Sequence, residues 1–362
     1  MKRKARGAIA LLVSLAVSGV LSVSSKPLFA QGGSELVVLT PVLYGPVVAG
    51  VISPIMKSKY NVTVRYEDLL SSEIMAKVQA EKARPEASVA CPSADGLVSG
   101  MRADLWQKLD LSVVTNIKEL APFARLKPYG EYGVGISGAT AVLEYHTGVF
   151  KEKGWKAPTS WWDLKDPRYK GRVGLTSTTS GTAVGLLMFW ARVLDPKHPR
   201  GNVDAAFNFA SDLVKAGQIL SFPTRSSEVN QLMERGEIWI ATQYSEGAYQ
   251  FAAKGAPVSA VTPQEGTVLF ATGCSIVKAA PNPKMANEFI NLMIGARYQR
   301  ALALDRWSIP ANSTQELPPS WAKYLSFSKE QQAKMYVPDV EEFAEFRPAW
   351  HNRWVKEIES RR

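Results

Sequence analysis

The sequence predicts an α/β protein whose mainly parallel sheet is covered by helices on both faces. Short β-branched segments alternate along the chain with segments of helical periodicity, which is the pattern typical of such folds. The sequence contains no repeat of fixed period and no low-complexity tract. With 362 residues, 46% of them hydrophobic, the chain is long enough for two domains, each with its own core.

Residues 1–30 have the layout of a secretory signal peptide and not of a folded element. Four basic residues among the first six precede an apolar stretch at 8–21, and Ala30 offers a cleavage site before Gln31. This stretch is interrupted by small and polar residues and is shorter than the ~20 apolar residues that span a bilayer. An uncleaved membrane anchor is therefore the lesser alternative, and we expect the mature chain to be exported.

Charge and composition exclude several classes of function. The net charge falls by five, from +10 to +5, when residues 1–30 are removed, because that segment holds five basic and no acidic residues. No basic run interleaved with aromatic residues remains, so nucleic-acid binding is not expected. Three histidines and two cysteines leave little material for a metal centre or an iron–sulfur cluster, so we expect no metal and no cofactor.

Export would place Cys91 and Cys274 in an oxidising compartment, where a disulfide is chemically allowed. The two residues are 183 positions apart, and each is flanked by small or apolar residues. This setting favours two buried free thiols.

The first part of the mature chain alternates strands and helices. We expect strands at 35–40, 61–66 and 87–91, followed by helices at about 45–58, at 71–82 and from 92–95 onward. Ligands bind beyond the carboxyl ends of the strands in parallel sheets. The loops at 40–44, 70–72 and 92–95 should therefore share one rim.

A second alternating block follows an extended region at 132–145, which is predicted to form two pieces separated by glycines. The block is predicted to contain strands at 172–176 and 237–242 and helices near 181–193, 201–216, 226–235 and 246–254. An extended stretch at 266–277 precedes helices at 283–295 and beyond. The last fifty residues are predicted to be helices that pack across the body of the protein.

Four segments, in this order, resemble those of bacterial ABC-transporter periplasmic substrate-binding proteins, in the branch that binds polyamines, ferric ion, thiamine and phosphonates. They are PTSWWDLKDPRYKG at 158–171, MERGEIWIA at 233–241, GAPVSAVTPQEG at 255–266 and APNPKMANEFI at 280–290. The resemblance runs over essentially the whole mature chain. It is specific for the family and not for the ligand.

The resemblance implies a two-lobed periplasmic-binding-protein fold of type II, in which two α/β lobes are joined by two crossing strands and close on a solute. The first lobe would comprise residues 31–137 plus 273–362, and the second 138–272. Such a receptor is a periplasmic monomer that needs no catalytic group. It delivers its solute to a transmembrane permease with its ATPase.

The solute is predicted from departures from the family pattern. Where polyamine binders carry acidic residues, this chain has Thr178, Gly181 and Thr272. A dication without those carboxylates would be buried unpaired, which is costly. Glu246 is one remaining acid, although it also suits the solvated first turn of a helix. Ferric binders carry adjacent tyrosines where this chain has Tyr244 alone, so iron is not expected. The resemblance implies an aromatic residue of the cleft at this position, so Tyr244 is a candidate ligand contact.

The hydroxyl-rich turn at 176–184 is the most informative segment. Ser180, Gly181 and Thr182 resemble the turn of phosphonate and sugar-phosphate relatives, where a helix start offers N–H groups to an anion. The alternative is simple N-capping by Ser180. We therefore expect a phosphonate, a phosphate ester or a carboxylate as the ligand. The remaining candidate contacts lie at strand ends and helix starts: Tyr44, Ser71, Ser72, Ser93 and Asp95.

Two other functions are kept as alternatives. The first is a spermidine- or putrescine-type receptor. The second is a secreted serine hydrolase, which would need a Gly-x-Ser-x-Gly turn or an equivalent arrangement. The segment around Ser137 lacks that glycine spacing, and none of the three histidines stands in a recognisable catalytic context. We therefore predict that the protein is not an enzyme.

Overall fold

The computed structural model describes residues 34–126, 130–198 and 200–361. The predicted signal peptide lies outside the described residues. Among the helices that the structure describes, none combines the length and the apolar character needed to cross a membrane.

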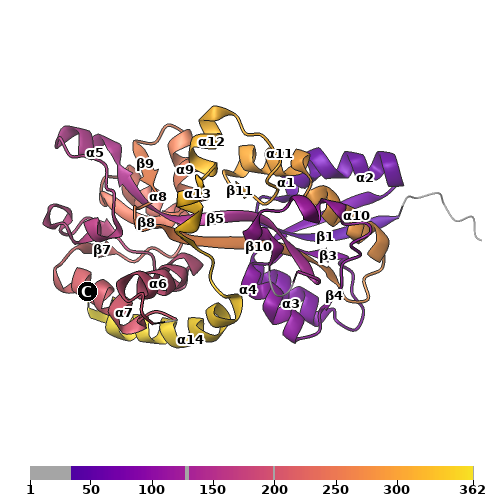
Figure 1. Cartoon of the computed structure of the whole chain (residues 1–362), viewed down its shortest axis with the longest axis horizontal. Coiled ribbons are helices and arrows are strands. Elements are labelled where there is room, and N and C mark those ends of the chain that lie inside the picture. The colour runs from indigo at the N-terminus through magenta and orange to yellow at the C-terminus, as the bar shows by residue number, and fades with distance from the viewer. Residues whose placement is uncertain (1–33, 127–129, 199, 362) are drawn as a thin grey trace, which may run out of the picture. The chain divides into compact units, whose positions relative to one another are not determined.

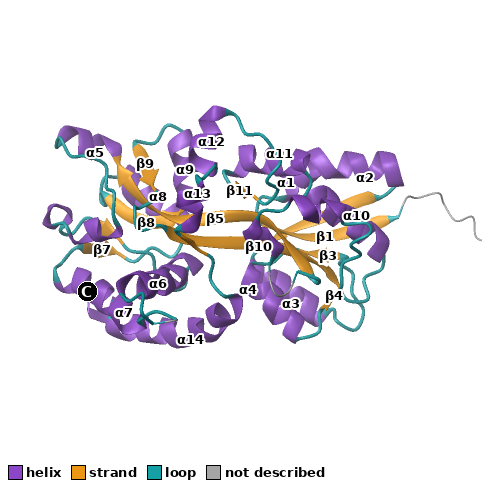
Figure 2. Ribbon diagram, viewed as in Figure 1, coloured by secondary structure: helices purple, strands orange, loops and turns teal. Residues whose placement is uncertain are grey.

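The described strands form one mixed, 12-stranded sheet (Figure 2). Its main path follows the order β2 (Thr63–Leu69), β1 (Glu35–Pro41), β3 (Val89–Ala90), β10 (Thr267–Val277), β5 (Gly133–His146), β8 (Ile240–Tyr244), β6 (Val173–Gly174) and β7 (Ile219–Ser221). Four short strands pair off this path: β4 (Trp106–Gln107), β9 (Val258–Val261), β11 (Ile309–Pro310) and β12 (Met335–Tyr336).

The pairing at the two ends of the sheet is parallel, as the alternating pattern predicts, but the centre is antiparallel. β1 runs parallel to β2 and β3, and β6 runs parallel to β7 and β8. Between them, β5 and β10 pair antiparallel with each other and with their neighbours β8 and β3. The extended region at 132–145, expected as two pieces, is the single 14-residue strand β5.

Helices cover both ends of this sheet (Figure 1). Around β1–β3 lie α1 (Gly45–Val47), α2 (Ser53–Tyr60), α3 (Ser71–Ala80), α4 (Ala94–Arg102), α10 (Pro283–Met293) and α11 (Ala296–Arg306). Around β6–β8 lie α5 (Thr147–Glu152), α6 (Gly181–Leu194), α7 (Val203–Lys215), α8 (Ser226–Glu234) and α9 (Ser245–Ala253). The C-terminal region adds α12 (Pro319–Leu325), α13 (Lys329–Ala333) and α14 (Val340–Glu357).

The crossing strands join the two largest hydrophobic clusters of the described residues. We call the cluster around β1, α2 and α10 the first core and the cluster around β6, α6 and α7 the second core. β5 contributes Ile136 to the first core and Leu143 to the second, and β10 contributes Ile276 and Val268 in the same way. The predicted lobe boundaries stay a prediction. The last helix, α14, places Trp354 in the second core and lies beside α6 and α7 (Figure 1).

Cys91 and Cys274 form a disulfide bond, so the prediction of two free thiols was wrong. The register of β3 against β10 explains the pairing. Ser275 lies opposite Ala90 in this antiparallel pair, so the next position of each strand brings the two cysteines face to face. A sequence separation of 183 residues hides this register.

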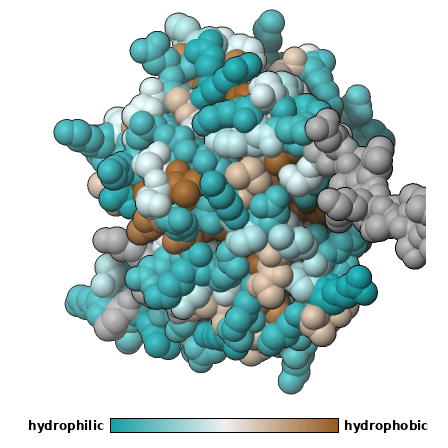
Figure 3. Space-filling model, turned by 90° about the vertical axis from the view of Figure 1, so that its right-hand side faces the viewer, coloured by the Kyte–Doolittle hydropathy of each residue, from teal (hydrophilic) through white to brown (hydrophobic). Residues whose placement is uncertain are grey.

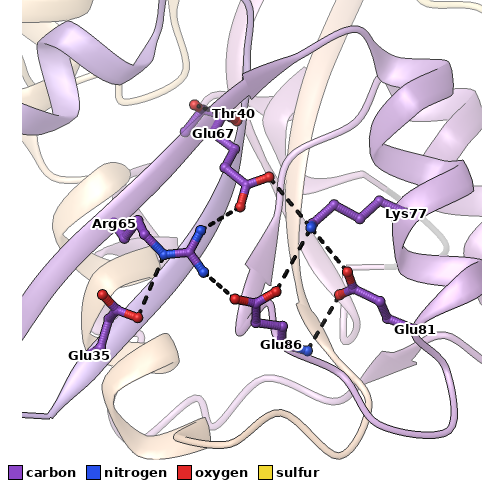
Figure 4. A network of polar contacts seen from close by, with 7 residues as sticks. All are labelled: Glu35, Thr40, Arg65, Glu67, Lys77, Glu81 and Glu86. Carbon is purple, nitrogen blue, oxygen red and sulfur yellow. Dashed lines mark hydrogen bonds and ion pairs between the residues drawn. The ribbon is translucent and has the colours of Figure 1, made fainter.

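An ion-pair network joins side chains of β2 and α3 (Figure 4). Arg65 lies 2.6 Å from Glu67 and also pairs with Glu86, while Lys77 lies 3.0 Å from Glu81. Because these side chains are partly exposed, each pair contributes at most about 1 kcal/mol to the free energy of unfolding. The end of the molecule near α2 and α10 presents mainly hydrophilic residues, with a few separate apolar ones (Figure 3).

Candidate functional site

A cavity of about 1060 Å³ lies where β5 and β10 cross between the two cores. The first-core side supplies Ser71, Ser93, Asp95 and Phe123, and the second-core side supplies Gly181, Tyr244, Glu246 and Gln250. The crossing strands provide the floor through Ser137 and Thr272. A solute in this cavity would touch both sides of the protein at once.

The structure brings seven of the twelve predicted site residues to the cavity wall: Ser71, Ser93, Asp95, Gly181, Tyr244, Glu246 and Thr272. Five lie outside the lining: Tyr44, Ser72, Thr178, Ser180 and Thr182. The seven lie at strand ends, at helix starts or on a crossing strand, which is why the sequence pattern could indicate them.

The five other predicted residues form contacts within the protein or are exposed to solvent. Thr178 is buried, and its hydroxyl lies 3.0 Å from Nδ1 of His351 on α14. Ser180 accepts a hydrogen bond from the Thr182 N–H at 3.3 Å, so it caps α6 as the simpler interpretation predicts. Ser72 is exposed on α3. Tyr44 is buried behind the wall, with its hydroxyl 3.0 Å from Oγ of Ser137.

Five helices of nine or more residues begin at the cavity: α3, α4, α6, α8 and α9. The first N–H groups of a helix lack intrahelical partners, and the helix dipole adds a partial positive charge there. Ser71 and Ser93 tie two of these starts together, with their hydroxyl oxygens 2.7 Å apart. The convergence of helix starts favours a negatively charged group in the cavity.

Gly181 opens α6 directly against Tyr244. A Cβ atom at position 181 would lie only 2.7 Å from the Tyr244 hydroxyl oxygen, so a larger residue would fit only if the Tyr244 side chain shifted. The Tyr244 ring packs edge-on against Phe270 with centroids 5.1 Å apart, and burial raises the pKa of the Tyr244 hydroxyl to about 12. Tyr244 therefore presents a neutral hydroxyl beside the α6 helix start.

The charged residues of the wall carry a positive excess. Three basic side chains, Lys254, Arg306 and Arg347, face two acids, Asp95 and Glu246. Arg347 lies 3.4 Å from Asp95 and donates to the Thr179 carbonyl at 3.2 Å. Because Arg347 and Asp95 pair with each other, the remaining charged residues of the wall are two basic ones, Arg306 and Lys254, and one acid, Glu246.

Arg306 and Glu246 face each other without direct pairing. Nε of Arg306 is buried and has no hydrogen-bond partner within the described part of the chain. Burial raises the pKa of Glu246 to about 7, although the Arg306 charge and a hydrogen bond from Tyr44 oppose that rise. The cavity therefore holds a guanidinium that has no anionic partner within 4.0 Å among the residues that the structure describes.

Sequence reasoning missed Arg306 and Arg347. Both lie in helices near the C-terminal end of the chain, far from the strand ends that a parallel sheet marks for ligands. Much of the remaining wall is apolar, including Leu97, Met101 and Phe343, and suits the carbon body of an organic solute. No group of three potential metal ligands comes together in the residues that the structure describes.

Residues 51–329 match the model of the bacterial extracellular solute-binding protein family. The chain belongs to this family. The spermidine/putrescine-binding periplasmic protein of Escherichia coli (strain K12) is 29% identical over 195 residues, which cover 52% of this chain and 53% of that protein. The putrescine/cadaverine-binding protein of Pseudomonas aeruginosa is 25% identical over 243 residues, which cover 63% and 66%. The match thus spans about half to two thirds of these relatives.

Solved structures of solute-binding proteins share the fold. An ABC transporter structure from Clostridium perfringens superposes with a TM-score of 0.74 at 22% identity, covering 89% of this chain and 99% of that one. The periplasmic binding protein AfuA from Actinobacillus pleuropneumoniae, with fructose-6-phosphate bound, gives 0.69 at 24% identity, covering 90% and 99%. These similarities confirm the predicted two-lobed α/β fold of this solute-binding protein.

Proposed function

We propose that this protein is the periplasmic receptor of an ABC importer and that it captures a small organic solute with an anionic group. Export by a signal peptide at 1–30 would deliver it to the periplasm, and a membrane permease with its ATPase would receive the solute. The observation that supports this proposal most is the cavity itself. It combines five helix starts with Arg306, whose buried Nε has no partner among the described residues.

Capture would work through a shift between open and closed arrangements of the two sides. A solute contacts both sides fully only when they are closed, so its binding energy increases the population of the closed form. β5 and β10 are the strands across which such a movement would pass, and their register shifts between Thr272 and Gly273 at the cavity floor. No covalent step is needed, so the proposed receptor is not an enzyme.

A polyamine is the second candidate, because Glu246 lines the cavity and two relatives are named as polyamine-binding proteins. The positive excess of the wall opposes it. A diamine would have to approach Arg306 and Lys254, and the positions at 178, 181 and 272 supply no carboxylate. Like charges in a partly buried site disfavour binding.

A thermal-shift and calorimetry panel on the chain without residues 1–30 tests the proposal. The probes are phosphonates, phosphate esters, carboxylates, putrescine and spermidine. At a concentration 100-fold above Kd, a bound anion should stabilise the fold by about 2.7 kcal/mol. Arg306→Gln should reduce that response. Arg297→Gln, an exposed arginine on the same helix, should leave it unchanged. A polyamine that binds more tightly than every anion would overturn the anionic assignment.

A further inference from the structure

Two opposite charges stand next to each other in the cavity without neutralising each other. Arg306 and Glu246 both line the wall, and the Arg306 charge opposes the rise that burial causes in the pKa of Glu246. Among the described residues, no ion pair within 4.0 Å involves either side chain. The fold therefore places a guanidinium and a carboxylate in one site and leaves both available.

The protein satisfies these two groups only in part. Tyr44 provides a hydrogen bond to Glu246, and the Tyr44 hydroxyl in turn lies 3.0 Å from Oγ of Ser137. The Glu246 carboxylate still has lone pairs that accept further donors. Nε of Arg306 is buried with no acceptor in the described residues. Buried polar groups without partners are costly, which favours a ligand that supplies both a donor and an acceptor.

The other charge pair of the cavity behaves differently. Arg347 is paired with Asp95 and also binds the Thr179 carbonyl, so neither charge requires a partner from the solute. Lys254 is exposed and can be solvated by water. Arg306 and Glu246 are thus the charged residues of the described wall that a charged ligand would pair with.

We propose that the solute is a zwitterion of the amino-acid type, with its carboxylate on Arg306 and its ammonium on Glu246. This inference rests on the proposed receptor function and narrows its solute class. The helix starts around the cavity add N–H donors for the carboxylate. Phe123, Leu269 and Phe270 line the same cavity and offer an apolar surface to the carbon skeleton. A plain anion would leave Glu246 buried beside another negative charge, and a plain amine would leave Arg306 without a partner.

Matched probe sets test this inference by calorimetry at pH 8, above the value of about 7 to which burial raises the pKa of Glu246. One set is phenylalanine, 3-phenylpropanoate and 2-phenylethylamine, and the other is 5-aminopentanoate, pentanoate and pentylamine. In at least one set, the zwitterion should bind the wild-type protein at least tenfold more tightly than the matched anion and amine. This comparison needs no variant and therefore does not depend on how any substitution folds.

Two variants then test which charged group of the ligand pairs with Glu246 and which pairs with Arg306. Glu246→Gln should weaken zwitterion binding at least tenfold and leave anion binding unchanged or stronger, whereas Arg306→Gln should weaken both. Glu152→Gln and Arg297→Gln are matched controls at exposed positions and should bind as the wild type does.

The outcomes separate the two proposals. The zwitterion inference is wrong if anions bind as tightly as zwitterions, or if no probe of either set binds. In either case, the panel of anions and polyamines described above still tests the receptor proposal separately. If Glu246→Gln leaves zwitterion binding unchanged, the assignment of the ammonium to Glu246 is wrong. If pentylamine or putrescine binds most tightly, both proposals fail.

Discussion

Arg347 of α14 lies 3.4 Å from the carboxylate of Asp95 on α4, and this ion pair links the two sides of the cavity. α14 is fixed to the second core, because Trp354 is buried there and Arg353 lies 2.6 Å from Asp204 of α7. A second ion pair joins the same two helices, since Arg102 of α4 lies 3.6 Å from Glu341. α14 therefore contacts both sides of the cavity.

Arg347→Gln should loosen the ligand-free protein without unfolding it. The Asp95–Arg347 pair is partly exposed, so its loss should cost no more than about 1 kcal/mol in the free energy of unfolding. The radius of gyration from small-angle X-ray scattering should increase, because one contact between the sides is removed. Lys165→Gln breaks an exposed pair with Asp212 within the second-core side and serves as the control. Equal scattering curves for wild type and Arg347→Gln would show that the pair does not hold the sides together.

Thr178→Val should affect stability more than ligand binding. The Thr178 hydroxyl contacts His351 on α14 and lies outside the cavity lining. Loss of this hydrogen bond should cost about 1 kcal/mol, measured by urea unfolding. The Kd of the best ligand from the panel should change less than threefold. A tenfold loss of affinity would instead indicate that Thr178 contacts the ligand.

Gly181→Ala should weaken ligand binding by displacing Tyr244. The added methyl group would lie 2.7 Å from the Tyr244 hydroxyl oxygen, so the ring must move away from the start of α6. Calorimetry should show at least a threefold increase in Kd. Gly50→Ala is the matched control, because its Cβ would meet no atom within 4 Å. Unchanged affinity in Gly181→Ala would place the ligand away from the α6 helix start.

The disulfide should stabilise the fold by about 2–4 kcal/mol, the usual range for such bonds. Dithiothreitol should therefore lower the melting temperature of the wild-type protein. The Cys91→Ser/Cys274→Ser variant should melt at the lower temperature with or without the reductant. A wild-type melting temperature that does not respond to full reduction, checked by thiol titration, would contradict this prediction.

Glu144 should make the ligand-free protein less stable as pH rises. This β5 side chain is fully buried and accepts a hydrogen bond from Gln243, and burial raises its pKa from 4.5 to about 8. Between these values the folded protein binds a proton that the unfolded chain has released, so the free energy of unfolding falls as pH increases. Urea unfolding at pH 5 to 8 should show this fall.

Glu144→Gln should make that pH dependence shallower, because the amide has no proton to release. The exposed substitution Glu152→Gln should keep the wild-type slope. Equal slopes for Glu144→Gln and wild type would mean that Glu144 is not protonated in the folded protein.

The sequence could predict those parts of the site that follow local rules. Gly181 could be identified because it stands at a recognisable helix start after a strand and resembles the turn of phosphonate and sugar-phosphate relatives. Tyr244 could be identified because the resemblance implies an aromatic residue at that position of the cleft. Arg306 could not be identified in this way, since nothing local distinguishes an arginine at a helix end that faces a cavity from one that faces water. The Cys91–Cys274 bond depends on strand register between β3 and β10, which only the folded chain defines.

The most direct test is calorimetric titration of the mature chain and its Arg306→Gln variant with the tightest-binding organic anion or zwitterion. Our account predicts one solute per chain and at least a tenfold higher Kd for Arg306→Gln than for the exposed control Arg297→Gln. Equal Kd values for these two variants would contradict the claim that the cavity between the two cores holds the anionic group of the solute.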